Sequence, residues 1–103
     1  MIVLLSPDVP PALTDVDRLD RLHAESPGPL ADMMDGSLCR FDPDGEHVWL
    51  DIAVARAAGA EVAGDADWAE GYEAMITYAA SKGWTDDAGT HVRAHVEVAA
   101  GTK

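Results

Sequence analysis

One segment of this chain, residues 67–82, constrains the fold more than any other, because its apolar side chains recur at helical spacing. The apolar stripe consists of Trp68, Tyr72, Met75, Ile76 and Ala79. Asp67 and Glu70 stand at the two positions of a capping box, and Gly83 follows as a left-handed helix end on which Trp84 can fold back. A helix of this kind must bury its stripe against a second layer of structure.

The second layer is predicted to be a β-sheet. Residues 90–98 alternate strictly between apolar and polar side chains, which is typical of a strand that is buried on one face. A helix that begins at Thr85 would also align several apolar side chains of this segment, so that alternative stays open. Residues 37–42 and 46–52 flank a Pro-Asp-Gly turn and predict a β-hairpin.

The N-terminal half supplies a further strand and two more helices. Residues 2–5 are wholly apolar, which predicts a short strand that is covered on both faces. Thr14 is placed to cap a helix that ends before Ser26, with apolar side chains on one face. A second short helix is expected over residues 30–35, closed by Gly36. The face of the first helix consists of Val16, Leu19 and Leu22.

The segment after the hairpin is alanine-rich, and alanine has the highest helix propensity. A helix is therefore expected over residues 52–58, capped by Asp51 and ended by Gly59, with a loop over residues 60–66. An extension of the preceding strand through Val54 is the alternative.

These elements predict a single α+β domain over residues 1–98 and a frayed tail over residues 99–103. A small mixed or antiparallel sheet, made of the N-terminal strand, the central hairpin and the C-terminal strand, would pack against two to four helices. The 103 residues are 48% hydrophobic and 25% charged, which is a globular composition with room for one modest core.

The charge balance limits the partners. The chain has 7 Lys and Arg against 19 Asp and Glu, so its formal net charge is −12. Nucleic-acid backbones and anionic lipid surfaces both require clustered basic side chains, so neither partner is expected. Residues 57–81 contain no basic residue and five acidic ones, which predicts an acidic surface that serves solubility or recognises a basic partner.

The first five residues are apolar, but the run stops at Ser6 and Pro7. It is too short for a signal peptide or a membrane helix, so a cytoplasmic location is expected. A single cysteine, Cys39, excludes an internal disulfide and is expected to be a small buried core residue.

The polar face of residues 90–98 carries the candidate site residues His91, Arg93, His95 and Glu97. Arg93 offers a planar fork for a carboxylate or phosphate, and the two imidazoles flank it. In a strand the two histidines are about 13 Å apart and cannot share one metal ion. His95 and Glu97, about 7 Å apart, could share one, but no third ligand can be placed, so no metal site is predicted. Pairing of this face with acidic side chains of a neighbouring strand is the alternative.

Trp49 on the hairpin is the aromatic side chain best placed to contact a ligand if its face is open. The sequence predicts an acidic accessory or interaction protein that self-associates and has no catalytic activity. The alternative is a small-molecule-binding domain or small enzyme that uses the five site residues for an anionic or polar ligand. No cofactor is predicted, and the expected partner is another protein or a second copy of the chain. A concave pocket on the polar face would favour the alternative.

Overall fold

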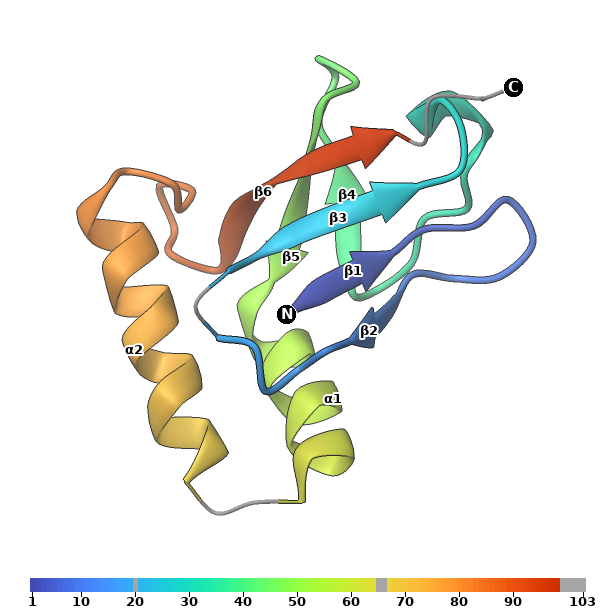
Figure 1. Cartoon of the computed structure of the whole chain (residues 1–103). Helices are drawn as coiled ribbons and strands as arrows, with labels where there is room; N and C mark the ends of the chain where they lie inside the picture. The colour runs from blue at the N-terminus through green and yellow to red at the C-terminus, as the bar shows by residue number, and fades with distance from the viewer. Residues whose placement is uncertain (20, 65–66, 99–103) are drawn as a thin grey trace.

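The computed structural model describes residues 1–19, 21–64 and 67–98. In these residues a curled, mixed sheet of six strands packs against two α-helices, which lie together at one end of the sheet (Figure 1). The strands are β1 (Ile2–Leu4), β2 (Ala12–Thr14), β3 (His23–Ser26), β4 (Cys39–Phe41), β5 (His47–Asp51) and β6 (His91–Val98). The helices are α1 (Ile52–Ala63) and α2 (Trp68–Ser81), and a short 3-10 helix, η1, spans Leu30–Asp32. The α+β class is confirmed.

The strand order is β2-β1-β3-β6-β5-β4. Strand β1 pairs antiparallel with β2 and parallel with β3, and β3 pairs parallel with β6. Strand β5 then pairs antiparallel with both β6 and β4. The predicted hairpin is therefore confirmed as β4 and β5, and the predicted strand over residues 90–98 is confirmed as β6, which begins at His91.

Apolar and polar side chains alternate along the strands, so that one face of the sheet packs into the core. On β6, Val92, Ala94 and Val96 are buried, as the sequence predicts. Val98 continues the same alternation but is 45% exposed. The core residues of the neighbouring strands are Val3, Ala24, Cys39, Val48 and Leu50.

Helix α2 closes the core and matches its prediction closely. The Trp68 and Tyr72 rings stack with their centroids 5.0 Å apart, and the Trp68 indole N–H donates to the Val16 carbonyl at 2.7 Å. Gly83 takes a left-handed φ of 77°, and the backbone N–H of Trp84 donates to the Ala79 carbonyl. The capping box is wrong in one respect, because the Asp67 side chain makes no capping hydrogen bond.

The predicted helix after Thr14 is wrong. Residues 12–14 and 23–26 become β2 and β3 instead, because each pairs with one side of β1. At residues 23–25, the backbone groups that a helix would use internally are thus taken by the sheet. Asp15, at a positive φ of 49°, turns the chain out of β2. The apolar positions still reach the core, since Val16 is buried and Leu19 and Leu22 are half-buried.

Two element boundaries and the burial of one strand also differ from expectation. Helix α1 begins at its predicted cap, Asp51, but runs through the expected stop at Gly59 and ends at Gly64, which has a φ of 60°. Residues 60–63 are therefore helical rather than a loop, and η1 is shorter than the predicted helix over 30–35. Strand β1 is covered on one face only, since Leu4 is 41% exposed.

The predicted frayed tail over residues 99–103 lies outside the described residues. Within the described ranges, no helix is long and apolar enough to cross a membrane.

Candidate functional site

The outer face of the sheet, opposite the core, carries all five site residues predicted from the sequence. The register pairs Trp49 with Arg93 and Asp51 with His91 on β5 and β6, and it pairs Glu97 with Glu25 on β3. The chain's four histidines all lie on this face as well. They are His23, His47, His91 and His95. The face divides into three neighbourhoods with different chemistry.

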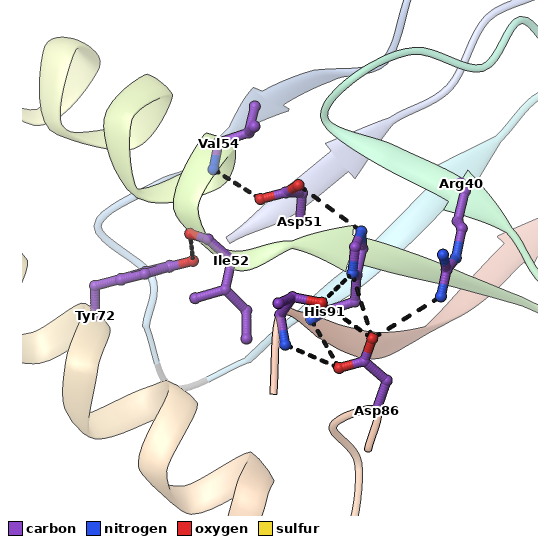
Figure 2. A network of polar contacts seen from close by, with 8 residues as sticks. Arg40, Asp51, Ile52, Val54, Tyr72, Asp86 and His91 are labelled. Atoms are coloured by element: carbon purple, nitrogen blue, oxygen red, sulfur yellow. Dashed lines mark hydrogen bonds and ion pairs between the residues drawn. The ribbon is translucent and has the colours of Figure 1, made fainter. Parts of the chain in front are cut away.

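The first neighbourhood surrounds His91, which stands between two carboxylates (Figure 2). Its Nδ1 lies 3.4 Å from Asp86 Oδ2, and its Nε2 lies 3.8 Å from Asp51 Oδ2. Asp51 also accepts the backbone N–H of Val54 at 3.0 Å and so caps α1. Arg40 reaches Asp86 from β4 at 3.9 Å. His91 therefore connects β6 to the start of α1 and to the loop before β6. At His91 the polar face pairs with acidic side chains, which was the alternative to a ligand site in the sequence analysis.

Asp86 organises that loop. Its Oδ1 accepts the backbone N–H groups of Thr90 and His91 at 2.9 and 3.1 Å, and its Oδ2 accepts the Thr90 hydroxyl at 3.1 Å. Desolvation acts to raise the pKa of Asp86, but these hydrogen bonds and the nearby His91 outweigh it and lower the pKa. The ionised carboxylate is the form that holds the loop together.

The second neighbourhood is a hollow beside Arg93. A cavity of about 280 Å³ is lined by Arg93, His95 and His47, together with two residues from outside the sheet, Leu22 and Trp84. An adjoining cavity of about 590 Å³ shares Leu22, Trp84 and Arg93. We call the two together the Arg93 groove. Its other lining residues are Leu19, Arg21, Gly71, Ala74, Met75, Tyr78, Ala79 and Val92.

The structure thus separates the predicted residues. Arg93 and His95 line the Arg93 groove, whereas His91 and Trp49 do not. The Trp49 indole N–H donates to Asp42 Oδ2 at 2.8 Å, which holds the ring toward the hairpin turn. Leu22 and Arg21 were missed because their segment was expected to be a helix. Trp84 was expected only to close α2, although its aromatic ring was a signal that could have pointed to the groove.

The third neighbourhood is a cluster of one imidazole and two carboxylates. One potential ligand atom from each of His23, Glu25 and Glu97 lies within 4.8 Å of the other two. His23 Nε2 is 3.0 Å from Glu25 Oε2. From the sequence, His95 and Glu97 were the pair that could share a metal ion. In the structure the His95 ring contacts the His47 ring instead, with centroids 5.6 Å apart. The residues from β3 were missed because that strand was expected to be the end of a helix.

Two other titratable groups belong to the scaffold. Burial, with a smaller effect of Asp35, raises the pKa of Cys39 to about 12, so its thiol stays protonated in the core. Asp44 lies in the hairpin turn and accepts the backbone N–H of Glu46 and the ring of His47. These bonds hold the pKa of Asp44 below its ordinary value.

Comparisons with protein-family models, with curated proteins and with solved structures found no match to the chain.

Proposed function

We propose that this protein binds a small organic anion that carries a flat apolar group, and that it does so in the Arg93 groove. The observation that carries the proposal is the position of Arg93 beside Trp84, where both residues line both cavities. A guanidinium group binds carboxylate or phosphate through two parallel hydrogen bonds, and an indole ring offers an apolar surface beside it.

The electrostatics of the groove favour an anion. Arg21 and Arg93, two of the chain's seven basic residues, both line the larger cavity. Among the residues that the structure describes, no carboxylate forms an ion pair with Arg21 or Arg93, whereas Arg40 pairs with Asp86 and Arg56 with Glu73. The positive charge at the groove is therefore available to a ligand, although the protein as a whole is strongly acidic.

The shape of the groove favours an apolar body on that anion. Its walls include side chains of α2 together with Leu19, Arg21 and Leu22. The Tyr78 and Trp84 rings meet edge to face there, with centroids 6.0 Å apart. A volume of about 590 Å³ falls within the range typical of small-molecule sites.

The test is a titration with naphthalene-2-carboxylate and its neutral amide, followed by NMR shifts of the Trp84 indole N–H. We expect saturable shifts with the carboxylate and at least tenfold weaker binding of the amide, since the charged hydrogen bonds are lost. Arg93→Gln should weaken binding about tenfold. Arg40→Gln is the control, because Arg40 lies on the same face outside the groove. No saturation, or equal losses in both variants, would contradict the proposal.

Self-association, the first expectation from the sequence, is the second candidate. It is favoured by an apolar groove of about 640 Å³ at the ends of β1, β3 and β6, where Leu4, Val9 and Val98 are 41–54% exposed. A second copy of the chain could cover these side chains. Sedimentation equilibrium should then show a dimer that Leu4→Glu dissociates and that Val62→Glu, on exposed α1 surface, leaves intact. A monomer at all concentrations would reject this candidate.

A further inference from the structure

The same His-X-Glu pattern occurs on two neighbouring strands of the outer face. Strand β3 begins with His23-Ala24-Glu25, and β6 contains His95-Val96-Glu97. The strands are parallel, and their register pairs Ala24 with Val96 and Glu25 with Glu97. The backbones of Glu25 and Glu97 are therefore direct neighbours, and the two glutamates extend from the same face of the sheet.

Two carboxylates at paired positions repel each other unless a cation lies between them. His23 Nε2 lies 3.0 Å from Glu25 Oε2, within hydrogen-bond distance. In the residues that the structure describes, neither an arginine nor a lysine forms an ion pair with Glu25 or Glu97, as the pairs of Arg40 and Arg56 lie elsewhere. The formal charge of −12 adds to the attraction for a cation.

The ligand atoms are already close to the spacing of a metal site. At zinc bond lengths, two ligand atoms on one tetrahedral ion lie about 3.3 Å apart. The atoms of His23, Glu25 and Glu97 lie within 4.8 Å of one another, so rotations of the two flexible glutamate side chains can close the remaining distance. The three residues belong to β3 and β6, which are interior strands of the sheet, so strand pairing holds their backbones in place.

We infer that His23, Glu25 and Glu97 bind a divalent transition-metal ion such as Zn²⁺. Imidazole nitrogen together with carboxylate oxygen is a donor set that suits this ion, whereas Mg²⁺ prefers oxygen ligands alone. Three protein ligands leave coordination positions open for water or another molecule. The site is independent of the proposed anion binding, because none of its three residues lines the Arg93 groove.

The experiment is calorimetric titration of the untagged chain with Zn²⁺ and, separately, with Mg²⁺. We expect one Zn²⁺ per chain and at least tenfold weaker binding of Mg²⁺. His23→Gln, Glu25→Gln and Glu97→Gln should each weaken Zn²⁺ binding about tenfold or more, since each removes a ligand. Circular dichroism checks that each variant folds. Glu97 is exposed, so its variant keeps the test valid even if the half-buried His23 is needed for folding.

Two controls distinguish this site from general attraction to an acidic, histidine-bearing face. His47→Gln removes an imidazole from the same face, and Glu46→Gln removes an exposed carboxylate near the hairpin turn. Both should bind Zn²⁺ within about twofold of the wild type, since neither residue belongs to the cluster. Absence of Zn²⁺ binding, equal affinity for Mg²⁺, or equal losses in the control variants would overturn the inference.

Discussion

A Cβ atom on Gly59 would lie 2.5 Å from the Trp68 ring, a distance that real Cβ atoms essentially never show. Helices α1 and α2 meet at this point, and only a glycine leaves room for the indole. The ring cannot easily move away, because it stacks on Tyr72 and donates its N–H to the Val16 carbonyl. A glycine that seems from the sequence to end a helix thus serves as a packing site within it.

Gly59→Ala should destabilise the protein by about 1–3 kcal/mol, because overpacking outweighs the higher helix propensity of alanine. Gly71→Ala is the matched control in α2. Its added Cβ would meet only the flexible end of Leu19, at 2.8 Å, and should change stability by less than about 1 kcal/mol. Urea denaturation of the two variants measures the difference, and equal losses would argue against the packing explanation.

Trp68→Ala should destabilise the fold by about 3–5 kcal/mol, because the ring is 4% exposed and its removal leaves a cavity. Ile76 belongs to the same predicted stripe but is only half-buried. Ile76→Ala should therefore cost less, about 1–2 kcal/mol. Chemical denaturation compares them. A loss below about 0.5 kcal/mol at both positions would show that the stripe is not core.

Asp51→Ala should destabilise the protein by about 0.5–2 kcal/mol, since it removes the side-chain oxygen that caps α1. Asp51→Asn keeps an oxygen that can accept the Val54 N–H, so it should retain most of that stability. Thermal unfolding of both variants distinguishes capping from the longer contact between Asp51 and His91. If the asparagine variant lost as much as the alanine variant, the charge rather than the cap would be decisive.

The low pKa of Asp86 predicts a dependence of stability on pH. Folding favours the ionised carboxylate, so its contribution is complete above the ordinary pKa of 3.8. The contribution is lost as the pH falls through the lower folded-state pKa. Urea denaturation at about pH 6 and about pH 3 should show a larger acid-induced loss for the wild type than for Asp86→Asn. The control, Asp87→Asn at an exposed position, should behave like the wild type.

Cys39 should be unreactive in the native protein. The thiol is 2% exposed and its pKa is raised to about 12, so both access and ionisation oppose reaction. A thiol reagent should label it several orders of magnitude faster in urea than in buffer, because labelling requires unfolding. Rapid native labelling would show that β4 opens readily.

Local signals made part of the fold predictable. Helix α2, the hairpin and β6 each carry a periodicity or turn that is complete within a short stretch of sequence. Strands β2 and β3 have three and four residues and no such period, and their pairing with β1 depends on contacts elsewhere in the chain. The apolar spacing of residues 16, 19 and 22 fits a buried turn segment as well as it fits a helix.

The same distinction holds for the candidate sites. The exposure of Arg93 and His95 followed from alternation on one strand, and the structure places both at the Arg93 groove. The pairing of Glu97 with Glu25 could not be predicted, since their strands lie near opposite ends of the chain. The imidazole and carboxylate that complete the cluster with Glu97 are a property of the sheet, not of either segment.

The two outermost strands, β2 and β4, have only three residues each. Strand β2 also follows Pro10 and Pro11, and proline has no backbone N–H to donate. Such short edge strands offer few backbone hydrogen-bonding groups to a strand of another molecule. They therefore protect a β-rich protein against fibril formation by intermolecular strand pairing. Short edge strands thus leave side chains, rather than backbone hydrogen-bonding groups, as the main means by which this chain can select a partner.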